Sequence, residues 1–244
     1  MEEVFRVANC KNLAETGGGH NQKGVNFQRA WALARMFELE REGVDDFLFL
    51  FEAIQDVAEL DSSLSPSSIR VYQVKKKDRG EWSWRELTKL LEPSSKKSGA
   101  QSPSVIKDSM IGKLYSAVVA FKELKSSGRF ISNVGCDLPL QGQANAATSL
   151  ACDLSRLEAG HLQLLSKGLE TLHEAESLPP RPSLIHVEKV PIHPDSPSTH
   201  LRGIAVSFLS ERSPKHAGQA TALVDALLAA IGPLGAKTDW VWLF

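Results

Sequence analysis

With 244 residues, of which 42% are hydrophobic, the chain can bury a substantial core as one large domain or two small ones. Its formal net charge of −1 provides no overall attraction to nucleic acid, so DNA binding would have to depend on local clusters of cations. Cys10, Cys136 and Cys152 show no CxxC spacing, which argues against a disulfide framework or a zinc site, and we expect three buried thiols. The chain has no apolar run of membrane-spanning length, and its acidic start does not resemble a signal peptide. We therefore expect a cytoplasmic protein.

The first predicted element is a helix over 24–42. Its apolar residues recur with a spacing of three to four, which predicts one buried face: Phe27, Ala30, Trp31, Ala34 and Phe37. Gly17, Gly18 and Gly19 precede the helix. A glycine-rich run before a helix can hold a phosphate through backbone N–H groups, but a flexible turn is the better prediction where no GK[ST] follows.

Three strands are predicted next. The apolar run 47–51 has the length of a strand, and a second short run, 55–60, follows a tight bend at Ala53 and Ile54. After a loop rich in Ser and Pro, residues 69–75 alternate with a period of two, which indicates a third strand.

Four polar side chains interrupt these apolar strands: Glu52, Asp56, Gln73 and Lys75. Residues i and i+2 of a strand share a face, so Gln73 and Lys75 should project together toward the side that Asp56 faces. Carboxylate and carbonyl-type oxygens can hold a hard cation such as Mg²⁺, and an adjacent ammonium can assist an attacking water. Metal-assisted phosphodiester hydrolysis uses such a set, and the alternative is that these charges at strand ends are merely solvated.

This arrangement resembles the PD-(D/E)XK nuclease superfamily. Asp56 matches the first acid, and Gln73-Val74-Lys75 stands where the (D/E)-X-K triplet lies. A Gln oxygen can bind Mg²⁺ but brings no negative charge, so metal binding should depend more on Asp56 and Glu52. The chain is most similar to the branch that commonly has Q-V-K here: the double-stranded DNA endonuclease domain at the N-terminus of bacterial anti-phage effectors, such as those with a SAVED sensor in CBASS systems.

Further blocks carry the same resemblance in the family's order over residues 16–133. They are GGGHNQKGVNFQRAWALARMF, WSWREL, KLYSAVVAF and RFISN. From about residue 138 onward only LIHVEKV and LRGIAVSFL are similar to the family. The order of the blocks makes the match more specific than a lone short motif.

The resemblance implies roles for the polar residues of the strands. Asp56, Gln73, the Val74 carbonyl and Glu52 would hold Mg²⁺, for which Mn²⁺ is a possible substitute. Lys75 would orient or deprotonate water and stabilise charge on the phosphorane. The expected catalytic residues are thus Lys75, Asp56, Gln73 and Glu52.

Cations interleaved with aromatic residues follow the third strand. Lys76, Lys77 and Arg79 come first, Trp82 and Trp84 lie close behind, and a short helix is predicted over 85–91. Such a group suits a phosphate backbone. The alternative is a solvated charge run followed by two core indoles.

Other candidate DNA contacts come from the resemblance or from loops. The resemblance singles out Lys23 and Gln28, and Gln28 could equally be a solvated helix residue. Lys96 and Lys97 lie in a segment rich in Ser, Gly and Pro, which predicts a surface loop that either touches DNA or merely connects.

The remaining chain is predicted to be mainly helical. We expect a core helix over 106–124, a strand over 129–133, helical structure over 144–177 split near Gly160, a short strand over 184–190 and a helix over 217–231. The last residues, DWVWLF, form an apolar tail.

The predicted fold class is α/β, with a restriction-endonuclease-like core in which helices flank a small mixed sheet, and with a helical C-terminal half. The resemblance implies the order αβββαβ. We expect one nuclease domain over 1–244, with a core at about 16–135 and an extension at about 136–244.

The predicted function is Mg²⁺-dependent cleavage of double-stranded DNA with little sequence specificity, in anti-phage defence. The alternatives are a catalytically silent nucleic-acid or protein-binding module, for which Gln73 is the main argument, and an RNase on the same fold. The resemblance also implies a controlling sensor, on further chain or on a partner protein, that acts through homo-oligomerisation.

Overall fold

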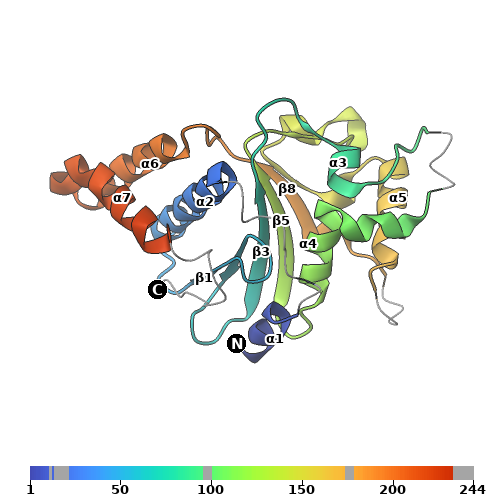
Figure 1. Ribbon diagram of the computed structural model, residues 1–244, viewed down its shortest axis with the longest axis horizontal. Coiled ribbons are helices and arrows are strands. Elements are labelled where there is room, and N and C mark those ends of the chain that lie inside the picture. Colours follow the sequence, from blue (N-terminus) through green and yellow to red (C-terminus); the bar gives the residue numbers. More distant parts are fainter. Residues whose placement is uncertain (11–12, 14–21, 96–100, 174–178, 233–244) are drawn as a thin grey trace.

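The computed structural model describes residues 1–10, 13, 22–95, 101–173 and 179–232, and its central element is a mixed sheet (Figure 1) that has six strands. In spatial order its strands are β1 (Leu48–Phe51), β2 (Val57–Leu60), β3 (Ser68–Lys75), β5 (Lys125–Ser132), β8 (Ile185–Lys189) and β7 (Ala151–Asp153). Strands β1, β2 and β3 pair antiparallel, β3, β5 and β8 pair parallel, and β7 pairs antiparallel with β8. A separate parallel pair consists of β4 (Trp82–Ser83) and β6 (Cys136–Asp137).

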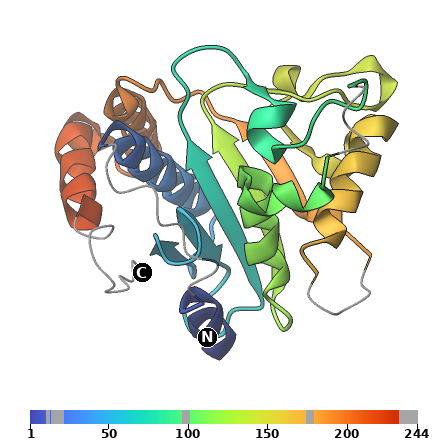
Figure 2. The ribbon, with the colours of Figure 1, turned by 45° about the vertical axis from the view of Figure 1, so that its right-hand side comes forward.

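Helices cover both faces of the sheet. The α-helices are α1 (Glu2–Ala8), α2 (Gln22–Arg41), α3 (Trp84–Thr88), α4 (Met110–Val119), α5 (Ala159–Glu170), α6 (Pro197–Arg212) and α7 (Ala220–Ile231). Short 3₁₀ helices are η2 (Pro103–Asp108), η3 (Gln141–Gln143), η4 (Ala146–Thr148), η5 (Leu154–Arg156), η6 (Pro182–Leu184) and η7 (Pro214–Gln219). Figures 1 and 2 show α2, α6 and α7 on one side of the sheet and α3, α4 and α5 on the other. No helix of the described residues is long and apolar enough to cross a membrane.

Helix α2 is the central helix of its side because it is buried on two flanks. The predicted stripe is confirmed, since Phe27, Ala30, Trp31, Ala34 and Phe37 are all buried. One flank packs on the sheet, where Phe27 and Trp31 meet Tyr72 and Val74. The other flank packs on α6 and α7 through Ala34 and Phe37. Residues of α2 are therefore held in a defined position relative to the end of β3.

The opposite face of the sheet packs against α4. Ile69 and Val71 of β3 belong to this core together with Leu114 and Val118 of α4. Gly128 of β5 permits the close approach, since a Cβ atom there would lie 2.8 Å from Leu114 Cγ and 2.7 Å from Ile185 Cδ1. Because β3 is covered on both faces, Ile69, Val71, Tyr72 and Val74 along it are all buried.

The succession α2-β1-β2-β3-α4-β5 confirms the predicted order αβββαβ, with β4 and α3 inserted after β3. The predicted bend between the first two strands is also confirmed, although it extends to Asp56 and β2 begins only at Val57. The helix predicted for 85–91 is shorter, because Lys89 adopts a left-handed conformation that ends α3.

Two predictions about helices were wrong. The single helix over 106–124 is divided into η2 and α4, because the side chain of Ser109 accepts a hydrogen bond from Gly112 N–H and caps a new helix. The first half of the segment 144–177 is mostly not α-helical: it contains η4, η5 and β7, and α5 begins only at Ala159. Asn145 and Asp153 cap the short 3₁₀ turns there with their side chains, which competes with a continuous helix.

The C-terminal half is otherwise largely helical, as expected, and it also contributes β7 and β8 to the main sheet. Helix α6 was not predicted. Of the three cysteines, Cys136 and Cys152 are buried as predicted, whereas Cys10 is exposed. Burial raises the pKa of the Cys136 thiol to about 12, so it stays protonated. The DWVWLF tail lies outside the described residues.

Candidate active site

The bend between β1 and β2 places Asp56 beside the end of β3. Glu52 begins the bend with a φ of 53°, and its N–H donates to the Asp56 carbonyl over 3.0 Å. A residue other than glycine in this left-handed region costs about 1 kcal/mol or more, and such residues persist where the surrounding structure determines them, often at functional sites. The bend is thus a specific feature of the chain that orients the Asp56 carboxylate.

The end of β3 has an open edge. Strand β2 pairs with β3 only as far as Val57 opposite Tyr72. Beyond that point the N–H of Val74 donates to Asp56 Oδ2 over 2.6 Å, and the Val74 carbonyl accepts from Gln28 Nε2 over 3.3 Å. Because no strand among the described residues covers this edge, the second lone pair of the Val74 carbonyl can serve a ligand.

Lys75 and Gln73 complete the group. Lys75 Nζ lies 3.2 Å from Asp56 Oδ1, with the lysine side chain 21% and the aspartate side chain 3% exposed. Alternation along β3 puts Gln73 on the same face as Lys75, and Gln73 is only 1% exposed. Within the described part of the chain, neither its Nε2 nor its Oε1 atom has a hydrogen-bond partner.

An unpartnered amide is costly in this position. Burial of an amide without compensating hydrogen bonds destabilises a protein by about 1–3 kcal/mol. The amide oxygen of Gln73, the carboxylate of Asp56 and the carbonyl of Val74 supply only oxygen, the donor that Mg²⁺ and Mn²⁺ prefer. The residues present therefore fit a hard divalent cation. Among the described residues no three His, Cys, Asp or Glu side chains cluster as a metal site, so such a cation would need the amide and carbonyl oxygens.

Glu52 lines a small cavity next to this group, together with a residue that sequence reasoning missed, Arg29. Arg29 follows Gln28 in α2 and donates to the Gly232 carbonyl at the end of α7 over 2.5 Å. Burial lowers the pKa of Arg29, and the negative charge of Glu52 partly offsets this effect. The cavity is lined by Val25, Gln28, Arg29, Phe51, Glu52, Asp56 and Ile231.

The predicted DNA-contacting cations lie beyond the end of β3, but two of them form local ion pairs. Lys76 Nζ lies 2.6 Å from Asp78, with the lysine side chain only 9% exposed. Lys77 Nζ lies 2.7 Å from Glu86 Oε1 and 4.8 Å from the centre of the Trp82 ring. The hydrogen bond from Lys77 lowers the pKa of Glu86 to about 2, so the Glu86 carboxyl is ionised at neutral pH.

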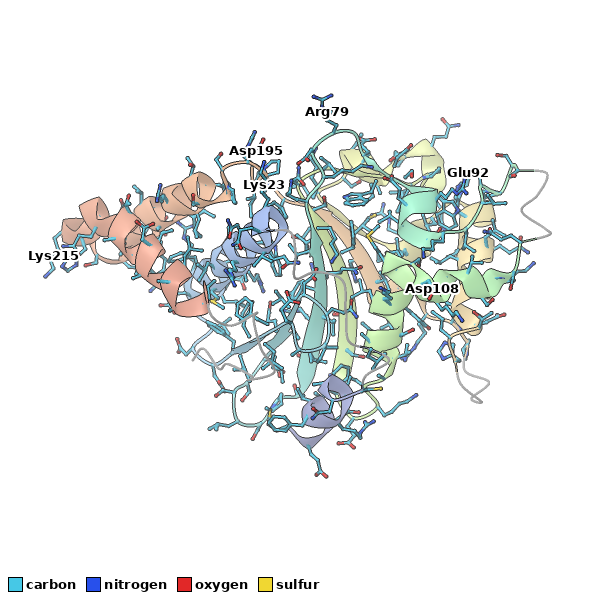
Figure 3. The ribbon with its side chains drawn as sticks, in the orientation of Figure 1. Lys23, Arg79, Glu92, Asp108, Asp195 and Lys215 are labelled. Carbon is cyan, nitrogen blue, oxygen red and sulfur yellow. The ribbon has the colours of Figure 1, made fainter. Side chains whose placement is uncertain are left out.

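Other predicted DNA contacts are more open to solvent. Arg79 is exposed, and Figure 3 shows it at the tip of the loop after β3. Lys23 lies 3.5 Å from Asp195, with both side chains mostly exposed, at the same upper edge of the molecule in Figure 3. Gln28 is turned to the Val74 carbonyl instead of to solvent. Lys96, Lys97 and the run Gly17–Gly18–Gly19 lie outside the described residues.

An acid in a bend, a Q-V-K triplet at the end of the next strand and helices on both faces of the sheet define a nuclease of the PD-(D/E)XK class. The family model described as "Cap4, dsDNA endonuclease domain" matches residues 16–232, and the chain belongs to this family. It is thus a double-stranded DNA endonuclease of anti-phage defence, which confirms the resemblance seen in the sequence. No curated protein and no solved structure matches the chain.

Proposed function

We propose that DNA cleavage at this site depends on a divalent cation, Mg²⁺ or in its place Mn²⁺, held by Asp56, Gln73, the Val74 carbonyl and Glu52. The observation that carries this proposal is the buried Gln73 amide, which lacks a partner among the described residues and lies two positions before Lys75, the partner of Asp56, on the same face of β3. When bound, such a cation polarises a phosphoryl oxygen and makes a water molecule more acidic. The lack of charge on Gln73 makes Asp56 the principal anionic ligand.

The protein side chains stabilise charge on the phosphate and orient the reacting groups. Lys75 places a positive charge where negative charge develops on the attacked phosphate, and it can orient the attacking water. Asp56 holds Lys75 Nζ at 3.2 Å and accepts from Val74 N–H. Gln28 donates to the Val74 carbonyl and thereby fixes its direction. Each group is oriented by a neighbour, which is a condition for catalysis by preorganised charges.

The duplex is proposed to cross the edge of the molecule at which β3 ends. Lys23 and Arg79 lie at that edge in Figure 3, Lys76 and Lys77 directly follow the last residue of β3, and Gln28 contacts the Val74 carbonyl. Arg79 is exposed and so can reach a phosphate directly, whereas Lys76 and Lys77 would first have to leave Asp78 and Glu86. Contacts to phosphate carry no sequence information, so we expect little sequence specificity.

Control of the activity is a further part of the proposal. An uncontrolled nuclease would damage the host's own DNA, so we propose a sensor, on further chain or on a partner protein, that acts through homo-oligomerisation in the cytoplasm. Size measurement by light scattering, with and without DNA, would test the oligomer. A particle that stays monomeric during cleavage would contradict it.

Plasmid cleavage tests the metal requirement. The full chain is incubated with supercoiled plasmid and Mg²⁺, Mn²⁺ or a chelator, and a parallel reaction contains structured RNA. We expect cleavage of the plasmid with either cation, none with the chelator and none of the RNA. Cleavage in the chelator would overturn the metal proposal, and RNA cleavage would favour the RNase alternative.

A further inference from the structure

Where the pairing of β3 with β5 ends, the side chain of the next residue, Asn133, hydrogen-bonds to the main chain that follows β3. The parallel ladder ends with Lys75 opposite Ser132. The next residue, Asn133, uses its side chain: Oδ1 accepts from Lys77 N–H over 2.9 Å, and Nδ2 donates to the Lys77 carbonyl over 2.9 Å. A carboxamide has the same donor and acceptor as a peptide group, so Asn133 acts as one additional rung of the ladder.

Side-chain contacts of Lys77 and Trp82 hold the segment after β3 as well. Lys77 Nζ donates to the Glu81 carbonyl over 2.6 Å as well as to Glu86. Trp82 Nε1 donates to Ser132 Oγ over 2.8 Å. The main chain at Lys77 is thus held through both its backbone and its side chain, and the loop that carries Arg79 begins from a fixed point.

This anchor lies two residues beyond Lys75. Strand β2 does not cover this part of β3, so β5 is the only strand that pairs with it within the described chain. The end of a strand that is paired on one edge opens more readily than its centre, because fewer contacts must be broken. A displacement of about 1 Å at a catalytic group can lower the rate about 10²-fold.

We propose that Asn133 is a positioning residue for DNA cleavage: by holding the backbone of Lys77, it sets the place of the Lys75 ammonium beside Asp56. The inference depends on the role proposed for Lys75. Asn133 carries no charge and contacts backbone, so its contribution should fall on the chemical step and not on DNA affinity.

The experiment compares Asn133→Ala with Asn145→Ala in the full chain at saturating Mg²⁺ and duplex. Asn145 is a matched control, because it also braces a loop, with Oδ1 accepting from Ala147 N–H over 2.8 Å and Nδ2 donating to Asp137 over 2.8 Å. We expect kcat to fall about 10- to 100-fold in Asn133→Ala, in keeping with displacement of a catalytic group, with a change of less than about twofold in duplex Kd. Asn145→Ala should keep its kcat within about twofold even where its Tm falls equally.

The pH dependence of kcat in Asn133→Asp distinguishes a positioning role from a purely structural one. A protonated carboxyl has the shape of the amide, with one donor and one acceptor, whereas a carboxylate only accepts and faces the Lys77 carbonyl. The Lys77 carbonyl that it would face disfavours the charged form and raises the pKa of an introduced carboxyl, so the kcat of this variant relative to wild type should fall as the pH rises from about 5 to 8. A flat ratio, or wild-type kcat in Asn133→Ala, would overturn the inference.

Lys75→Ala in the same assay separates the two proposals. If Lys75→Ala is inactive while Asn133→Ala cleaves normally, only the positioning role is wrong. If folded Lys75→Ala cleaves at the wild-type rate, the function proposed for Lys75 is wrong, and the inference fails with it.

Discussion

Two buried carboxylates close to β3, Glu59 and Asp56, lie three residues apart in the chain, and they differ in whether the polar groups around them all have partners. Glu59 is 4% exposed and accepts from Arg35 Nε over 3.2 Å, Arg70 Nη1 over 2.5 Å and the Tyr72 hydroxyl over 2.7 Å. Asp56 is 3% exposed and accepts from Val74 N–H and Lys75 Nζ, but the buried amide of Gln73, on the same strand as both donors, has no hydrogen-bond partner in the described chain. The first region is satisfied within the protein, and the second has bonding capacity left for a ligand.

The electrostatics of Glu59 agree with a structural role. Burial by itself would raise the pKa of Glu59, but hydrogen bonds from Arg35 and Tyr72 and the charges of Arg35 and Arg70 outweigh it, so the pKa is lowered. Burial and the Glu59 carboxylate raise the pKa of Tyr72, which therefore remains a donor. The network ties α2 to the middle of the sheet. The comparison teaches that buried polar groups with all their hydrogen-bond partners in the protein mark the region that stabilises the fold. A buried polar group without such partners marks the region proposed to bind a ligand.

The largest effect is expected from Glu59→Ala, which leaves Arg35 and Tyr72 without their buried partner. Breaking a buried ion pair costs about 3–5 kcal/mol, so the free energy of unfolding should fall by about that amount in urea denaturation. Glu38→Ala is the control, because Glu38 also pairs with Arg35 but is 58% exposed, and an exposed pair contributes about 1 kcal/mol or less. Equal losses in the two variants would contradict the structural role of Glu59.

The pH dependence of stability sharpens the same prediction. The folded pKa of Glu59 lies below its ordinary value of 4.5, so its contribution is fully present above that value and is lost as the pH falls through the folded pKa. Wild type should therefore lose more unfolding free energy than Glu59→Gln between pH 6 and the acid range. Parallel curves for the two proteins would show that the network does not depend on the Glu59 charge.

Lys75→Ala tests the other region. We expect cleavage to fall by about two to three powers of ten, because a charge that stabilises the transition state is lost. Thermal unfolding should still show a cooperative transition, at a lower Tm, because the buried Asp56 carboxylate loses the Lys75 ammonium but keeps the hydrogen bond from Val74 N–H; cleavage is therefore compared well below both Tm values. Lys113→Ala, at an exposed lysine of α4, is the matched control and should cleave normally. A folded Lys75→Ala protein with near wild-type activity would sink the mechanism.

Substitutions at Gln73 should separate stability from activity. Gln73→Met removes the unpartnered amide at similar volume, so we expect the protein to gain about 1 kcal/mol and to lose Mg²⁺ binding in calorimetry. Gln73→Glu should bind Mg²⁺ at least as tightly as wild type, because it adds a negative ligand. Asp56→Ala should lose binding altogether. Unchanged Mg²⁺ affinity in both Gln73→Met and Asp56→Ala would place the metal elsewhere.

The smallest effect concerns DNA affinity at the loop after β3. Arg79 is exposed and Lys77 is paired with Glu86, so Arg79→Ala should reduce the slope of log affinity against log salt by about 0.9 and Lys77→Ala by less. Fluorescence anisotropy with two unrelated duplexes measures both slopes. The same slope in Arg79→Ala and wild type would mean that the duplex follows another face.

The sequence by itself determined the order of the core elements and the candidate site. Local patterns can be recognised in the sequence without knowing what the segment packs against. Three such patterns are the period-two alternation of the strands, the apolar stripe of α2 and the Q-V-K triplet. That is why Asp56, Gln73 and Lys75 could be named before the structure, which then places Lys75 Nζ 3.2 Å from Asp56 Oδ1.

Only the tertiary structure decided which polar groups find partners. Glu59 and Arg35 are 24 residues apart, Lys77 and Asn133 are 56 residues apart, and Arg29 and Gly232 are 203 residues apart. No periodicity connects residues at such separations, because their meeting depends on how whole helices and strands pack. The same reason explains why α6 was missed. The apolar contacts of α6 lie on α2 and α7, so its position becomes visible only once those helices are assembled.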